Sequence, residues 1–184
     1  MAKTFGPSAL ATPANAVTAA RVAATPVLLG MIGRHGPAWR VLAFWTALAG
    51  SDTVDGALAR RHGTTRSGAY LDPLADKLLV LGAMWALVAR RRFTPVPVAV
   101  ITTREVAMSA YRTSMLRRGV SIPARPSGKR KTLVQSLAVG IALLPPARRI
   151  PWLADGLLWV AAALTVTSGV QYWRDGKEAV ARAV

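Results

Sequence analysis

The chain has 184 residues, of which 52% are hydrophobic, and this size fits one domain in a membrane. It carries a net charge of +16 and has no cysteine, which excludes disulfides and thiolate metal sites. The basic residues alternate with long apolar runs and form no single soluble basic face, which argues against nucleic acid as a partner. Anionic lipid headgroups and phosphorylated substrates explain the charge better. Residues 1–11 lack an adequate apolar core, so we expect no cleaved signal peptide.

Six apolar segments approach the length of about 20 residues that a helix needs to cross the hydrocarbon layer. They are residues 14–33, 38–60, 68–89, 94–117, 131–147 and 152–173. Short connections join them, and no internal repeat or second domain is apparent. We therefore predict an all-α, polytopic membrane protein with six transmembrane helices, which form one domain over residues 1–184.

A polar stripe marks the first segment. Thr12 followed by Pro13 is typical of a helix start. Asn15, Thr18 and Arg21 then recur at i, i+3 and i+6, so they share one face of an otherwise apolar helix. Spacing alone leaves two interpretations. The stripe either belongs to a binding site or begins an interfacial helix whose arginine snorkels towards the membrane surface.

Four carboxylates lie within residues 52–76, and they are half of the eight acids in the chain. Asp52 and Asp55 are three residues apart and Asp72 and Asp76 are four apart, so on helices each pair projects from one face. Two such pairs on adjacent antiparallel helices would form a cup of oxygen ligands for hard divalent cations, with positions open for substrate phosphates. The alternative is that the acids only form ion pairs with nearby basic residues: Arg60, Arg61, Arg66 and Lys77.

The carboxylates lie at the ends of the second and third segments, which places them near one membrane interface. Pro73 lacks an amide hydrogen and disfavours helical angles at Asp72, so we expect the third helix to start or bend there. In either case the two carboxylate pairs meet at the same face of the membrane. A small cation transporter with these acids in its conduction path would need them deep in the bilayer, so this alternative is disfavoured.

The fourth segment contains ionisable residues, which at membrane depth usually face a bundle interior or a cavity. Glu105, Ser109 and Arg112 lie at i, i+4 and i+7 and form a polar stripe that could lead towards the carboxylates. A purely structural pair between helices is an equally good interpretation of Glu105. The role of the adjacent Arg104 stays open.

Charge asymmetry predicts the orientation. If the N-terminus is cytoplasmic, the positive-inside rule is satisfied, and the acidic window faces the cytoplasm. The arginine triplet in the second outer connection makes this asymmetry imperfect. The outer connections then hold seven of the 24 Lys and Arg residues: Arg34, Arg40, Arg90, Arg91, Arg92, Arg148 and Arg149. In the last segment, Tyr172 and Trp173 with Arg174 are typical of an interfacial aromatic belt.

The window 52–76 resembles the signature of the CDP-alcohol phosphatidyltransferases, Asp-x-x-Asp-Gly-x-x-Ala-Arg, a spacer, then Gly-x-x-x-Asp-x-x-x-Asp. One departure is that seven residues separate Arg60 from Gly68 where the family usually has eight. The difference falls in a loop with Gly63, so we expect it to change the turn and not the metal cup. The matching residues are Asp52, Asp55, Gly56, Ala59, Arg60, Gly68, Asp72 and Asp76.

The resemblance implies a metal-dependent reaction on a CDP-linked lipid. Two metal ions, Mg²⁺ or Mn²⁺, would lie against the pyrophosphate, held by Asp52, Asp55, Asp72 and Asp76. Asp76 would also take the proton of the acceptor hydroxyl that attacks the lipid-linked phosphorus. The family commonly carries Asn-x-x-Thr-x-x-Arg in its first segment, which favours the binding interpretation of that stripe. The residues implied to bind the CDP-lipid are Asn15, Thr18, Gly56, Ala59, Arg60, Thr65 and Gly68.

The most basic stretch, residues 112–131, suggests the branch of the family. Gly128, Lys129, Lys131 and Thr132 resemble the Gly-Lys-x-Lys-Thr pattern of phosphatidylglycerophosphate synthases, although a positive-inside loop explains part of this charge. Arg112, Lys129 and Lys131 are therefore candidates to bind an acceptor phosphate. The resemblance implies CDP-diacylglycerol and glycerol 3-phosphate as substrates, the cell (inner) membrane as location and a homodimer. The alternatives are a CMP-forming cardiolipin synthase and a phosphatidylinositol phosphate synthase.

Overall fold

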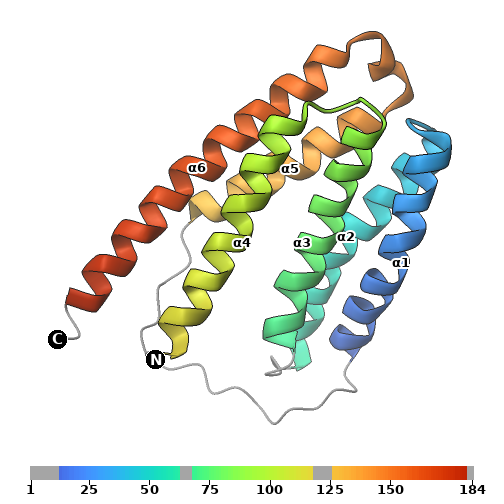
Figure 1. Cartoon of the computed structure of the whole chain (residues 1–184). Helices are drawn as coiled ribbons and strands as arrows, with labels where there is room; N and C mark the ends of the chain where they lie inside the picture. Colours follow the sequence, from blue (N-terminus) through green and yellow to red (C-terminus); the bar gives the residue numbers. More distant parts are fainter. Residues whose placement is uncertain (1–12, 63–67, 118–125, 182–184) are drawn as a thin grey trace.

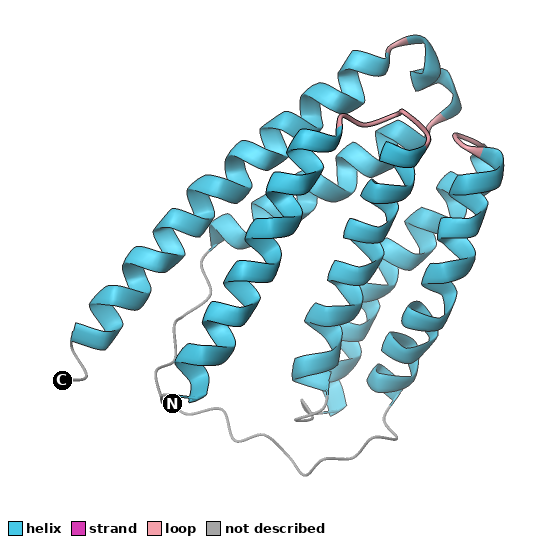
Figure 2. Ribbon diagram, in the orientation of Figure 1, coloured by secondary structure: helices cyan, strands magenta, loops and turns pink. Residues whose placement is uncertain are grey.

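The computed structural model describes residues 13–62, 68–117 and 126–181. Within these ranges the chain forms six α-helices and one 3-10 helix, without a strand (Figures 1 and 2). The predicted all-α fold with six helices is confirmed for this part of the chain. The elements are α1 (Pro13–His35), α2 (Trp39–His62), α3 (Gly68–Ala89), α4 (Pro95–Arg117), α5 (Pro126–Leu143), η1 (Pro145–Arg149) and α6 (Pro151–Ala181).

Successive helices run in opposite directions, so the bundle has two distinct ends (Figure 1). One end carries the starts of α1, α3 and α5 and the ends of α2, α4 and α6. We call it the motif end, because the acidic window lies there. The opposite end carries η1 and the connections 36–38 and 90–94, and we call it the η1 end. Helix α1 packs on α2 and α3, α6 packs on α4 and α5, and α3 joins the two groups through contacts with α4 and α5.

The apolar core fills the half of the bundle nearer the η1 end. It includes Leu28 and Ile32 late in α1 and Val41 and Trp45 early in α2. Along four helices, this core gives way to polar residues within about one turn. The boundaries lie between Leu79 and Lys77 in α3, Ile101 and Glu105 in α4, Ala138 and Gln135 in α5, and Ala162 and Thr165 in α6. The interior of the bundle is therefore apolar towards the η1 end and polar towards the motif end.

Large apolar side chains also cover the outside of the bundle. Val27, Val96, Val106 and Leu133 are each more than half exposed, a pattern that suits contact with lipid better than contact with water. Among the described residues, two helical segments are long and apolar enough to cross a membrane by length and composition. They are Ala16–His35 and Pro151–Glu178.

Several helix boundaries differ from those that the apolar runs predict. Helix α5 begins at Pro126 and stops before Pro145, because a residue that precedes proline disfavours helical angles and Leu144 is extended. Helix α6 continues beyond Trp173 to Ala181, so the aromatic pair lies inside the helix and not at its end. Helix α3 begins at Gly68, five residues upstream of Pro73, so the helix does not start at Pro73. Pro73 lies in the second turn, where it removes one backbone hydrogen bond of the helix.

Candidate active site

The structure describes only part of the predicted site. Side chains are described for residues 16–51, 74–115 and 130–178. Thr18, Asp76, Arg112 and Lys131 fall within these ranges. Thr65 and the segment around Gly63 lie outside the described residues altogether. For the other predicted ligands only the backbone is described: Asn15, Asp52, Asp55, Gly56, Ala59, Arg60, Gly68, Asp72 and Lys129.

The backbone brings the two halves of the acidic window to the same end of the bundle. Asp52 and Asp55 lie in the last three turns of α2, and Asp72 and Asp76 lie in the first three turns of α3. These two helices are in contact and antiparallel. A donor set of four carboxylates on two such helix ends fits a hard divalent cation. Among the described side chains, which include only Asp76 of the four, no cluster of three metal-ligating residues occurs.

The polar stripe of α1 is buried beside the start of this window. Thr18 is 1% exposed and Arg21 is 2% exposed. Arg21 Nε donates a hydrogen bond to Ser51 Oγ at 3.0 Å, and Ser51 immediately precedes Asp52 in α2. The interpretation of Arg21 as a snorkelling side chain is therefore wrong, because its guanidinium is directed into the helix interface and not towards the membrane surface.

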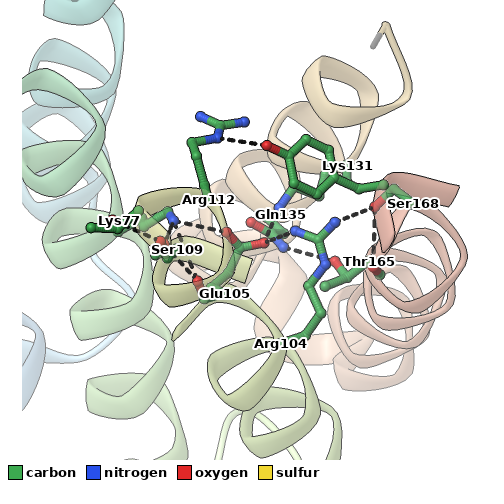
Figure 3. Close-up of polar contacts among 11 residues, drawn as sticks. Lys77, Arg104, Glu105, Ser109, Arg112, Lys131, Gln135, Thr165 and Ser168 are labelled. Atoms are coloured by element: carbon green, nitrogen blue, oxygen red, sulfur yellow. Dashed lines mark hydrogen bonds and ion pairs between the residues drawn. The ribbon is translucent and has the colours of Figure 1, made fainter. Parts of the chain in front are cut away.

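A buried carboxylate, Glu105 of α4, lies at the centre of the polar half of the bundle (Figure 3). Its Oε1 contacts Lys131 Nζ of α5 and lies 3.0 Å from Arg104 Nη1. Its Oε2 lies 3.5 Å from Lys77 Nζ of α3. We call these four residues the Glu105 cluster. The cluster agrees with one of the two interpretations of Glu105, a structural ion pair between helices, and it joins three helices and not two.

Hydroxyl and amide groups extend the cluster to α6. Arg104 Nη2 donates to Ser168 Oγ at 3.0 Å, and Gln135 Nε2 of α5 donates to Thr165 Oγ1 at 2.9 Å (Figure 3). Gly169 allows the close approach of Arg104, because a Cβ atom on this glycine would lie 2.9 Å from Arg104 Nε. The bonds of Arg104 to Glu105 and to Ser168 hold its guanidinium between α4 and α6, whereas its buried Nε has no hydrogen-bond partner among the described residues.

The Glu105 cluster carries more positive than negative charge. Lys77, Arg104 and Lys131 face one carboxylate, and Arg112 is near enough to repel both Lys77 and Arg104 electrostatically. Asp76 precedes Lys77 in α3 and attracts both Lys77 and Lys131. Buried charge in excess of its counter-charges is unfavourable in a bundle interior, so an additional anion would be stabilised beside Asp76.

Arg112 lies at the edge of the cluster and not inside it. Its Nε donates to the hydroxyl of Tyr172 at 3.2 Å, and its guanidinium lies 5.4 Å from the centre of the same ring. Tyr111 packs edge-on against Tyr172, with ring centres 6.2 Å apart. Tyr172 therefore holds Arg112 in place, in addition to any belt role, whereas Trp173 is 46% exposed and stacks under Lys177.

Several residues of this site are absent from the predicted ligand sets. Lys77 follows Asp76 directly, and Gln135 lies one turn after Lys131, so both are visible at helical spacing once the helices are known. Their partners are not visible in this way. Lys77 and Lys131 reach Glu105 across 28 and 26 residues of sequence. The two hydroxyls of α6 lie in an apolar run whose pattern contains no signal for an arginine or amide partner.

Comparison with known proteins assigns this chain to a protein family. The family profile described as CDP-alcohol phosphatidyltransferase matches residues 11–167. A protein of Mycobacterium tuberculosis named probable phosphatidylglycerophosphate synthase is 37% identical over 174 residues, which cover 91% of this chain and 82% of the relative. A Rickettsia bellii protein named CDP-diacylglycerol–glycerol-3-phosphate 3-phosphatidyltransferase is 34% identical over 89% of this chain and 94% of the relative. A Bacillus subtilis protein of the same name is 40% identical over 71% of this chain and 69% of the relative.

Proposed function

This chain belongs to the CDP-alcohol phosphatidyltransferase family, and we propose that it transfers the phosphatidyl group of CDP-diacylglycerol to glycerol 3-phosphate, releasing CMP. The observation that carries this choice of acceptor is the excess positive charge of the Glu105 cluster beside Asp76. An acceptor with a phosphate group needs basic side chains to bind it, whereas a lipid acceptor needs a lateral opening. The names of the relatives at 34–37% identity support the same acceptor.

Metal dependence follows from the family and from the donor set. Asp52, Asp55, Asp72 and Asp76 would hold one or two divalent cations, Mg²⁺ or Mn²⁺, at the motif end. Such ions, when bound, neutralise charge on the pyrophosphate and on the departing CMP. Arg21 supports this arrangement indirectly, because its hydrogen bond to Ser51 holds α1 against α2 one residue before Asp52. Thr18 lies on the same face of α1 and is buried, so its predicted contact with the CDP-lipid remains a prediction.

The protein side chains would perform the remaining steps. Lys131 and Arg112 would hold the phosphate of glycerol 3-phosphate through charge-assisted hydrogen bonds. Asp76 would accept the proton of the acceptor hydroxyl as its oxygen forms a bond to the lipid-linked phosphorus. The bond between that phosphorus and the oxygen of CMP breaks, CMP leaves as a phosphate anion, and the proton passes from Asp76 to solvent. Glu105 would orient Lys131 without touching the acceptor.

The predicted orientation completes the proposal. We propose six membrane-spanning helices with the motif end in the cytoplasm, where a water-soluble phosphorylated acceptor is available. Glycerol 3-phosphate would then enter the polar half of the bundle from the cytoplasm, and CDP-diacylglycerol would enter from the lipid. The predicted homodimer remains a prediction.

The test is CMP release by the purified protein in detergent with CDP-diacylglycerol and Mg²⁺. Glycerol 3-phosphate, phosphatidylglycerol and inositol 1-phosphate are compared in parallel, each with a chelated control. We expect turnover only with glycerol 3-phosphate and only with metal. Turnover with another acceptor would contradict the acceptor assignment and leave the transferase reaction intact. An absence of turnover with all three acceptors would contradict the proposed reaction itself.

A further inference from the structure

Three arginines gather at the η1 end, far from the acidic window. Arg90 and Arg92 follow the end of α3, and Arg148 belongs to η1. A Cβ atom placed on Gly36 would lie 3.2 Å from Arg90 Nη2 and 3.7 Å from Arg148 Nη2, so both guanidinium groups converge on the connection between α1 and α2. Arg92 Nη2 donates to the carbonyl of Ala147 at 3.3 Å, which brings it beside Arg148. We call Arg90, Arg92 and Arg148 the arginine triad.

The triad has no described counter-charge. Asp155 is the sole carboxylate at this end among the described side chains, and its two oxygens accept from the amide and hydroxyl of Thr94, each at 2.8 Å. Within the described residues, no carboxylate lies within ion-pair distance of the triad, and Arg92 Nε is buried without a hydrogen-bond partner. Burial, followed by the positive charge of Arg148, lowers the pKa of Arg92. A bound anion would supply the missing counter-charge and could accept a hydrogen bond from Arg92 Nε.

The turn that presents the triad is strained. The amide of Arg92 bonds to the carbonyl of Leu87, and the amide of Arg91 bonds to the carbonyl of Val88, the Schellman pattern of a helix end. Arg91 occupies its left-handed position, with φ of 55°, where glycine is the usual residue. An arginine in this conformation costs about 1 kcal/mol or more relative to glycine. Strained backbone of this kind is concentrated at functional sites.

Exposed aromatic residues place the triad at the level of lipid headgroups. Trp39 at the start of α2 is 62% exposed, and Trp152 at the start of α6 is 72% exposed. Both lie at the η1 end, and exposed tryptophans are enriched at the interface between a membrane and water. The guanidinium groups would therefore lie beside phosphates of the bilayer, and guanidinium forms paired hydrogen bonds with phosphate oxygens.

We propose that the arginine triad is a binding site for a phosphate group, supplied in the membrane by the headgroup of an anionic lipid. This site is separate from the Glu105 cluster, because the apolar core lies between the two. The proposal does not depend on the acceptor or on the orientation of the chain. Its ligand would tie the connections that precede α2, α4 and α6 together at one end of the bundle.

The test is thermal unfolding of the full chain in detergent, followed by tryptophan fluorescence. The unmodified protein is titrated with phosphatidic acid, with phosphatidylcholine of the same acyl chains, and with inorganic phosphate. At a phosphatidic acid concentration about 100-fold above its Kd, we expect the Tm to rise by about 5 °C or more. We expect phosphatidylcholine at the same concentration to raise the Tm less. An equal shift with inorganic phosphate would support the anion site and assign free phosphate as its source.

Matched variants locate the effect. Arg90→Gln/Arg148→Gln removes two exposed members of the triad, and Arg34→Gln/Arg40→Gln removes two exposed arginines from the same end as a control of equal charge. We expect the first pair to lose at least half of the lipid-induced shift and the control pair to keep it. The proposal is wrong if both pairs lose the shift equally or if neither does. If the double variant does not fold, Arg148→Gln alone replaces it. Lys131→Met should keep the full shift in Tm, which separates this site from the Glu105 cluster.

Discussion

The ammonium group of Lys131 on α5 contacts the carboxylate of Glu105 on α4, although these residues are only 7% and 5% exposed. A buried pair of this kind adds little net stability, but loss of one partner leaves a buried charge without compensation. The two residues of this pair therefore have different roles. Glu105 compensates several cations inside the bundle, and in the proposed function Lys131 would also bind the phosphate of the acceptor.

Glu105→Gln should destabilise the protein and weaken turnover together. The change removes the counter-charge of Lys77, Arg104 and Lys131, so we expect the free energy of unfolding to fall by about 3–5 kcal/mol. Thermal unfolding in detergent measures this loss. Asp155→Asn is the control, since Asp155 binds Thr94 at the opposite end of the bundle and should leave CMP release per folded molecule unchanged. Equal loss of activity per folded molecule in both variants would contradict the proposed role of Glu105 in orienting Lys131.

Lys131→Met should raise the KM for glycerol 3-phosphate about 10- to 100-fold, because a charge-assisted hydrogen bond contributes about 1.5–3 kcal/mol. Lys77 and Arg104 still compensate Glu105, so the fold should be retained. Steady-state CMP release at varied acceptor concentration measures the change. The KM for CDP-diacylglycerol should stay constant. Lys177→Met provides the control, since Lys177 lies over Trp173 on the outer part of α6, and a similar rise in KM there would contradict the assignment.

Asp76→Asn should lower kcat at least about 100-fold, the smaller end of the usual contribution of a general base. The substitution keeps the size of the side chain but removes a negative charge that attracts Lys77 and Lys131, so the thermal unfolding temperature should fall and kcat is compared per folded molecule. CMP release at saturating substrates and Mg²⁺ measures the effect. Full activity in this variant would exclude Asp76 as the base while leaving the family membership of the chain intact.

Gly169→Ala should disturb the Glu105 cluster from the α6 side. The new Cβ would lie 2.9 Å from Arg104 Nε, and Arg104 is held by both Ser168 and Glu105, so we expect a loss of about 1–3 kcal/mol in the free energy of unfolding. Gly156→Ala, also in α6, has open space around its Cβ position and should be neutral or stabilising by up to about 1 kcal/mol. If the two variants unfold at the same temperature, Arg104 adapts freely and its position is not fixed.

The six helices could be predicted because each needs only a local property, an apolar run of sufficient length. The ends of the helices were harder to predict. Helix α6, for example, continues to Ala181 through polar residues that follow the apolar run. The acidic window was visible because its spacing is regular within each helix. Glu105 was visible for the same reason, as part of a stripe. Its partners were not, because Lys77 and Lys131 come from other helices, and only the packing of α3, α4 and α5 determines that they meet.

The dependence of the polar half on α6 also bears on how the protein is made. Arg104 of α4 and Gln135 of α5 each donate a hydrogen bond to a hydroxyl group of α6, a helix that is synthesised after both of them. The acceptor is Ser168 for Arg104 and Thr165 for Gln135. In the proposed topology, a chain that ends before α6 would leave a guanidinium and an amide without these partners at membrane depth, where such groups are costly. The polar half of the bundle would then be complete only after α6 has been synthesised, so chains truncated before α6 would be unstable.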